Sequence, residues 1–167
     1  GTDVLPGLEA TSPPIPVPSA PFLEDGKTRR TLADYSGRGI VLNFWATWCG
    51  PCVREMPALD RLHEAAGDAF HVLALSSDRG GAPVVEKFYA KAGIANLTNL
   101  IDDKRQVLRK MKVRGLPTTI LIDAAGNEIG RVLGAAEWDA PDTIDFLRAC
   151  LAPAIPSMRT ASKKESP

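Results

Sequence analysis

The stretch FWATWCGPCVREMP, residues 44–57, decides the fold, because it places two cysteines where an apolar run becomes a helical one. Only Gly50 and Pro51 separate Cys49 from Cys52, in a chain with 3 cysteines in all. Such a pair has three common uses: half of a zinc site, an inert structural disulfide, or a dithiol that exchanges electrons with other proteins. The rest of the chain discriminates among these three uses.

The remaining residues favour the working dithiol. A structural zinc site needs four ligands, and beyond the pair the chain offers only Cys150, His63 and His71 as nitrogen or sulfur ligands. We interpret both histidines as ordinary surface or strand-edge residues. An inert disulfide stabilises by restricting the loop it closes, and a loop of two residues restricts the unfolded chain very little.

Composition excludes several classes of function. The 167 residues suffice for one domain with a sizeable core. Twenty basic residues balance 20 acidic ones, so no overall field attracts nucleic acid. The longest apolar run, residues 39–48, is much shorter than the ~20 residues that span a bilayer. We interpret Cys150 as a small buried apolar side chain of a C-terminal helix.

Hydrophobic periodicity predicts a regular alternation of strands and helices. The expected architecture is an α/β three-layer sandwich with a mixed central sheet, in which parallel units come first and an antiparallel hairpin closes the sheet. Strands are expected at residues 39–45 and 70–76, a hairpin at 118–134, and helices at 52–66, 80–93, 104–111 and 139–152. Pro57 is expected to kink the first helix or to divide it into two.

Three segments are expected along the chain. Six of the 14 prolines fall within the first 21 residues, which predicts a stiff Pro-rich tether over residues 1–20. The folded domain is expected over residues 21–153. Residues 154–167 have the polar composition of a flexible C-terminal tail.

The dithiol lies at a position that suits its chemistry. Strand carboxyl ends that enter helices are where open α/β sheets place their active groups. Cys49 comes just before the first helical turn, whose free N–H groups and positive dipole end favour a thiolate and therefore a nucleophile. Pro51 fits that turn because a proline nitrogen has no hydrogen to leave unbonded. Cys49 is expected to be exposed, and Cys52 to be shielded and to resolve the mixed disulfide.

Three motifs together resemble the thioredoxin superfamily over residues 20–150. They are FWATWCGPC, the proline at position 57 and the Leu-Pro-Thr-Thr of residues 116–119. Within the superfamily the chain is most similar to the TlpA/ResA/CcmG branch of bacterial envelope thiol reductases, and to TlpA-like proteins in particular. The features that carry this likeness are Asn43, Thr47, Glu55, an extra helical insertion at about residues 82–111, the Pro-rich lead-in and the segment LGAAEWDAPDTIDFLRA.

The resemblance implies a thiol:disulfide oxidoreductase of the periplasm or bacterial cell envelope. Its expected task is to reduce specific envelope proteins, either apocytochromes during cytochrome c biogenesis or proteins that assemble the copper site of cytochrome oxidase. Electrons are expected from a membrane donor of the DsbD or CcdA type. An N-terminal membrane anchor is expected outside this sequence. Neither a metal nor a nucleic acid is implied, and the redox-active disulfide Cys49–Cys52 takes the place of a cofactor.

The resemblance also assigns roles to individual residues. Pro117 is expected beside the dithiol, where a cis Leu116–Pro117 bond would bring the backbone close. Glu55 is expected to handle protons for Cys52, with a solvated helix carboxylate as the alternative. Expected substrate-binding residues are Trp48, Gly50, Pro51 and Leu116, the last being bulkier than usual and able to reshape the groove. Trp45 is expected in the core.

One departure from the superfamily pattern leaves a question open. Thioredoxins have a buried aspartate where this chain has Asn43, and an amide cannot relay a proton.

The second hypothesis for function is a Cu(I)-binding carrier that uses the same two thiols, because soft thiolates suit Cu(I).

A basic cluster is interpreted as the solvated face of a helix, with the steering of an acidic partner as the alternative. It comprises Lys104, Arg105, Arg109, Lys110, Lys112 and Arg114.

Overall fold

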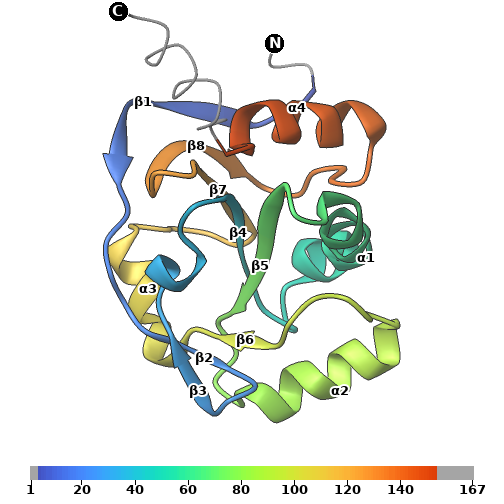
Figure 1. Ribbon diagram of the computed structural model, residues 1–167. Coiled ribbons are helices and arrows are strands. Elements are labelled where there is room, and N and C mark those ends of the chain that lie inside the picture. The colour runs from blue at the N-terminus through green and yellow to red at the C-terminus, as the bar shows by residue number, and fades with distance from the viewer. Residues whose placement is uncertain (1–3, 154–167) are drawn as a thin grey trace, which may run out of the picture.

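Strand β4 (Gly39–Trp45) forms the centre of the sheet, and all 7 of its residues are buried. It pairs in parallel with β5 (Phe70–Ser76) and antiparallel with β7 (Thr118–Ile122). The computed structural model describes residues 4–153. Both faces of β4 are apolar because it lies between two layers of helices, as Figure 1 shows.

The other strands extend the sheet on both sides of β4. They are β1 (Leu8–Pro16), β2 (Phe22–Glu24), β3 (Thr28–Arg30), β6 (Leu100–Ile101) and β8 (Asn127–Leu133). The strand order is β1-β8-β7-β4-β5-β6-β2-β3. The β4–β5 and β5–β6 pairs are parallel, and β7 and β8 form the expected antiparallel hairpin.

Helices pack on both faces of this sheet. They are α1 (Gly50–Ala66), α2 (Ala82–Ala92), α3 (Gln106–Lys110) and α4 (Pro141–Leu151), with 3₁₀ turns η1 (Leu32–Tyr35) and η2 (Asp103–Arg105). In residues 4–153 no helix combines the length and the apolarity needed to cross a membrane.

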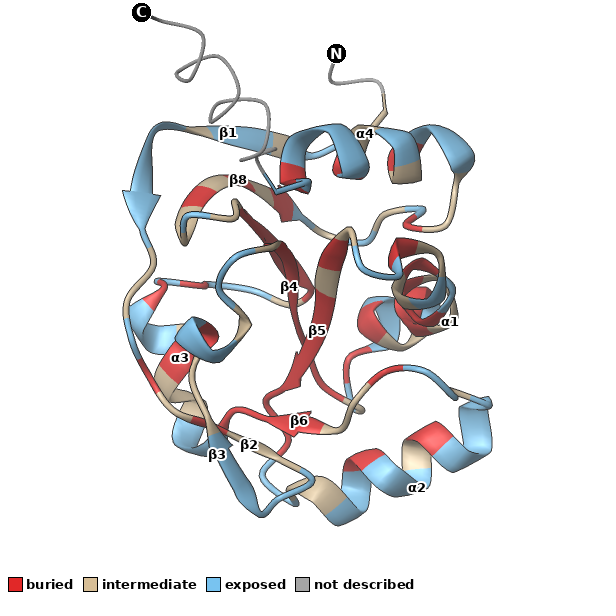
Figure 2. Cartoon of the chain, viewed as in Figure 1, coloured by how far each residue is buried: buried red, intermediate tan, exposed pale blue. Residues whose placement is uncertain are grey.

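Two hydrophobic cores separate the layers, and alternate residues of β4 face each of them. Val41 and Trp45 pack with the apolar faces of α1, α2 and α4. Ile40, Leu42 and Phe44 face the other core, which α3 and η1 cover. Figure 2 shows the buried residues in the central strands and on the inward helix faces. The predicted three-layer α/β sandwich with a mixed sheet is confirmed.

The prediction of a tether over residues 1–20 is wrong for the residues that the structure describes. Residues 8–16 form strand β1, which pairs with β8, and Leu5 lies in the core at 1% exposure. Prolines are tolerated here because β1 is an edge strand. Pro13 and Pro14 lie where the pairing is interrupted, between Ala10 and Ile15. The expected tail, residues 154–167, lies outside the described residues.

The expected helical insertion at about residues 82–111 contains α2 and α3, which lie on opposite faces of the sheet, and between them it adds strand β6, which the sequence did not indicate. One expectation about the last helix needs correction, because Cys150 is exposed rather than buried. The buried stripe of α4 runs through Thr143, Leu147 and Leu151, which leaves Cys150 outside it.

Helix α1 runs without interruption across Pro57, so the alternative of two separate helices is wrong. The helix begins at Gly50, two residues earlier than the apolar periodicity indicated, and ends at Gly67, whose φ is 51°. Residues with left-handed backbone angles are most often glycine, because glycine has no Cβ to clash. This start places the two cysteines at the N-terminus of the helix.

Candidate functional site

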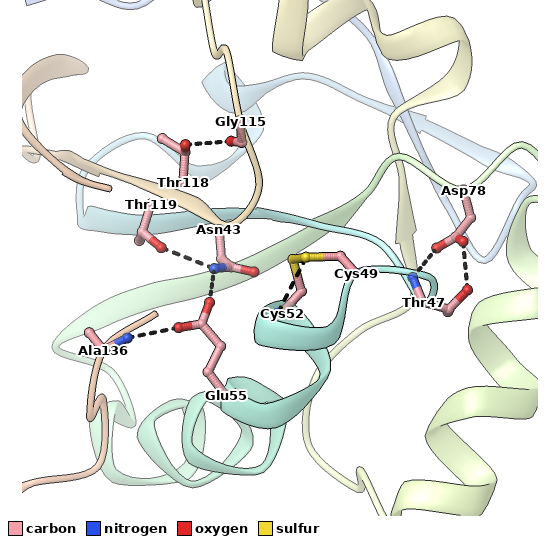
Figure 3. Close-up of a disulfide and its surroundings, with 10 residues drawn as sticks. All are labelled: Asn43, Thr47, Cys49, Cys52, Glu55, Asp78, Gly115, Thr118, Thr119 and Ala136. Carbon is pink, nitrogen blue, oxygen red and sulfur yellow. Dashed lines mark hydrogen bonds between the residues drawn. A yellow bond between two sulfur atoms is a disulfide. The ribbon is translucent and has the colours of Figure 1, made fainter. Parts of the chain in front are cut away.

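Cys49 and Cys52 form a disulfide where β4 passes into α1, with their Cα atoms 5.3 Å apart (Figure 3). Cys49 is the N-cap residue of α1, and its sulfur accepts a hydrogen bond of 3.4 Å from the backbone N–H of Cys52. A sulfur in this position takes up one of the N–H groups that every helix leaves free at its start. The expected position of Cys49, just before the first helical turn, is confirmed.

The two sulfurs differ in exposure, though less than expected. Cys52 is 0% exposed and Cys49 is 7% exposed, so only Cys49 has any contact with solvent. The expectation that Cys49 is exposed is therefore wrong for this disulfide-bonded state, although the order of the two residues is as predicted.

A cavity of about 290 Å³ lies at the mouth of the disulfide. Cys49, Trp48 and Leu116 line this cavity together, which brings together three residues that the sequence placed in the site. Trp48 is 65% exposed, whereas Trp45 is completely buried, as predicted. Gly50 and Pro51 are exposed nearby and do not line the cavity.

The peptide bond between Leu116 and Pro117 is cis, as the sequence suggested. Pro117 is buried, and its carbonyl oxygen accepts a hydrogen bond of 3.0 Å from the N–H of Gly134. The preceding Leu116 shares the cavity with Cys49. This loop therefore forms part of the wall of the cavity that Trp48 and Cys49 also line.

Glu55 lies behind the disulfide, one turn into α1, and its side chain is buried at 4% exposure. Its Oε2 accepts hydrogen bonds from the Trp138 indole (2.9 Å) and the Ala136 backbone N–H (3.0 Å). Its Oε1 accepts a bond of 2.9 Å from the Asn43 amide. The alternative that Glu55 is a solvated surface carboxylate is therefore wrong.

Burial raises the pKa of the Glu55 carboxyl above its ordinary value. The hydrogen bonds from Trp138, Ala136 and Asn43 act in the opposite direction and offset part of this effect. The group thus keeps its proton to a higher pH than a glutamate in water does. A raised pKa of this kind brings a carboxyl closer to the range in which general acid–base groups work.

Asn43 connects Glu55 with the disulfide. Its Nδ2 donates to Glu55 and also to Thr119 Oγ1 at 3.0 Å, which joins α1 to β4 and β7. Its Oδ1 is buried and has no hydrogen-bond partner among the described residues. In Figure 3 this oxygen points toward the side of the disulfide. An unpaired buried acceptor of this kind is rare in folded proteins.

Asp78 is a site residue that the sequence did not reveal. Its carboxylate accepts hydrogen bonds from the backbone N–H of Thr47 (2.9 Å) and the Thr47 hydroxyl (2.6 Å), as Figure 3 shows. The Ser76 hydroxyl donates a third bond of 2.7 Å. These bonds hold the loop that leads to Trp48 and Cys49. The sequence feature that could have identified Asp78 is its position just after β5, at the same edge of the sheet as the cysteines.

Trp138 is a second residue that was missed. It is completely buried and lies 83 positions from Glu55 in the chain, so no local pattern connects the two. Only the fold, which brings the loop before α4 to α1, places the two side chains within hydrogen-bonding distance.

Replacement of Glu55 by glutamine should change how stability depends on pH. Because the pKa of Glu55 is raised in the folded state, the folded protein keeps a proton that the unfolded chain releases above about pH 4.5. The contribution of Glu55 to stability is therefore full below that pH and is lost as the pH rises through the folded-state pKa. Glu55→Gln should remove this loss, in addition to a pH-independent change from the altered hydrogen bonds.

Urea unfolding of the disulfide-bonded protein from pH 4 to 7.5 measures the effect. Glu64→Gln, at an exposed position of the same helix, is the matched control and should give a curve parallel to wild type. A Glu55→Gln curve that is also parallel to wild type would contradict the raised pKa.

Comparisons with known proteins agree with this site. The family model described as Redoxin matches residues 13–146. The thiol-disulfide oxidoreductase ResA of Geobacillus kaustophilus (strain HTA426) is 43% identical over 57% of this chain and 54% of its own length. ResA of Bacillus subtilis (strain 168) is 30% identical over 78% of this chain and 73% of its own length. The chain spans little more than half the length of the first of these relatives.

A solved structure shares the fold. The pneumococcal exposed lipoprotein thioredoxin Etrx1, from Streptococcus pneumoniae strain TIGR4, superposes with a TM-score of 0.67 at 27% identity. The superposition covers 79% of this chain and 99% of that one. Fold, family model and relatives agree, and the chain belongs to the Redoxin family, together with ResA.

Proposed function

We propose that this protein is a reductant that reduces the disulfides of selected proteins in the cell envelope by dithiol–disulfide exchange. The observation that carries the proposal is the disulfide at the start of α1, with Cys49 at the cavity and Cys52 completely buried. A reductant of this kind needs one sulfur that a partner can reach and a second that waits behind it.

The reaction begins with the reduced protein. The Cys49 thiolate attacks one sulfur of a substrate disulfide, whose S–S bond breaks as a mixed disulfide forms, and the released substrate sulfur takes up a proton. The Cys52 thiol then loses its proton and attacks the Cys49 sulfur, which releases the second substrate sulfur as a thiol. Two electrons and two protons pass to the substrate, and the protein is left with the Cys49–Cys52 disulfide.

Glu55 is our candidate for the group that accepts the proton of Cys52. Its raised pKa suits this role, and Asn43 lies between it and the disulfide. Glu55 also lines a second cavity of about 690 Å³ together with Arg54 and Ala136. This cavity would allow the carboxyl to exchange its proton with solvent without passing through the substrate groove.

The proposed substrates are apocytochromes or proteins that assemble the copper site of cytochrome oxidase. A membrane protein of the DsbD or CcdA type would return electrons to the disulfide. Placement in the envelope is supported by the likeness to Etrx1, which is described as an exposed lipoprotein. The proposed anchor would precede the domain and hold it at the membrane.

The reduction potential tests whether the protein acts as a reductant. The Gly50–Pro51 pair between the cysteines is also that of thioredoxin, so we expect a value near that of thioredoxin, about −270 mV, rather than that of DsbA, about −120 mV. Equilibration with glutathione buffers measures it, and Cys150→Ser should give the same value, because Cys150 takes no part. A value close to that of DsbA would contradict a reducing role.

A trapping experiment identifies the substrates. Cys52→Ser removes the resolving thiol, so the mixed disulfide on Cys49 should persist and increase at least tenfold over wild type in envelope extracts. Mass spectrometry of the captured proteins should find apocytochromes or copper-site assembly proteins. The Cys49→Ser variant, as control, should capture nothing. A broad mixture of captured proteins would argue against selective reduction.

A further inference from the structure

A second cavity adjoins the cavity at Cys49. The first has a volume of about 290 Å³ and the second about 480 Å³. Ser77 and Arg105 line both cavities, which are therefore neighbours, and we treat the two as one groove that extends from the disulfide. A substrate segment next to the attacked disulfide would lie along this groove.

Basic side chains predominate in the groove. Its five cationic residues, which we call the basic groove, are Arg79, Lys104, Arg105, Arg109 and Arg114. Four salt bridges occur within residues 4–153, and none of them involves a residue of the basic groove. These charges are therefore available to a partner.

Three carboxylates also line the groove, but two of them are already engaged. Asp78 is buried and accepts bonds from Thr47 and Ser76. Asp102 is 2% exposed, and its two oxygens accept the backbone N–H groups at the start of α3, both at 2.9 Å. Only Asp103 is exposed. The groove thus presents five cations and one accessible carboxylate.

The backbone around Arg105 supports a role for its side chain. Lys104 and Arg105 have φ angles of 57° and 55°, in the left-handed region that favours glycine. The Asp102 carboxylate holds this turn through its bonds to Val107 and Leu108. Strained backbone of this kind concentrates at functional sites. The turn places a long basic side chain at the junction of the two cavities.

We propose that the basic groove selects substrates whose reactive disulfide is flanked by acidic residues. The inference rests on the proposed reductase function and adds its substrate class. Opposite charges accelerate encounter and orient the partner before chemistry, an effect that salt weakens. The interpretation of the basic cluster as a merely solvated helix face is thereby revised for Lys104, Arg105, Arg109 and Arg114. Lys110 and Lys112 do not line the groove.

Three peptides with the same disulfide ring test the proposal. Their flanking residues are aspartate and glutamate, serine and glycine, or lysine, and each is mixed with the pre-reduced full chain. Acid quenching and chromatography give the second-order rate constants. At 10 mM salt the acidic peptide should react about tenfold faster than the basic one, with the neutral peptide between them. At 0.5 M salt the ratio should fall below about threefold, because the Debye length is then only about 4 Å.

Substitutions in the groove locate the effect. Arg105→Gln combined with Arg114→Gln should bring the ratio of acidic to basic rates at 10 mM salt from about tenfold to below about threefold. Lys87→Gln combined with Lys91→Gln, at exposed positions on α2 outside the groove, removes the same two positive charges from the protein and should leave the ratio unchanged. An equal loss in both variants would assign the preference to overall charge and overturn the groove.

The outcomes separate this inference from the function on which it rests. If wild type reduces all three peptides at rates within twofold at both salt concentrations, the selection of acidic substrates is wrong and the reductase function stands. If it reduces none of them, the proposed function itself is wrong and the inference falls with it.

Discussion

The hydrogen bond from the Cys52 N–H to the Cys49 sulfur is the interaction on which this site depends. It exists because α1 begins a short loop after β4, with Cys49 as its N-cap residue. Free N–H groups and the helix dipole both favour negative charge at this position. The fully buried central strand leads into this loop, and the packing of the domain thereby places the Cys49 sulfur at the start of the helix.

A second constraint is the buried carboxyl of Glu55. Burial of a charged carboxylate without hydrogen-bond partners would be strongly unfavourable. Both oxygens of Glu55 accept hydrogen bonds from residues that pack against α1. Through Asn43 and Trp138 these bonds join β4 and the loop before α4 to the first turns of α1. The same contacts that stabilise the fold leave one unpaired acceptor, Asn43 Oδ1, on the side of the disulfide. Packing and the proposed proton handling therefore depend on one cluster.

The central strands and the dithiol were predictable because local signals specify them: β4 and β5 occupy the expected residues, and Cys49 caps the expected helix. Features that depend on contacts between distant parts of the chain were not predictable. Strands β2, β3 and β6 have only two or three residues each, too few to show a period. Prolines concealed β1, whose pairing is possible only at a sheet edge. The partnership of Glu55 with Trp138 required the fold itself, as did the groove that assembles around Arg105.

The most direct test of the account is the alkylation of the reduced protein by iodoacetamide as a function of pH, with each cysteine quantified by mass spectrometry. The account predicts that Cys49 reacts at least tenfold faster than Cys52 at pH 7, and that its pH profile has a midpoint below the pKa of about 8.5 of a free cysteine. Equal, slow reaction of both thiols with a midpoint near 8.5 would contradict it, because no thiolate would then be favoured at the start of α1.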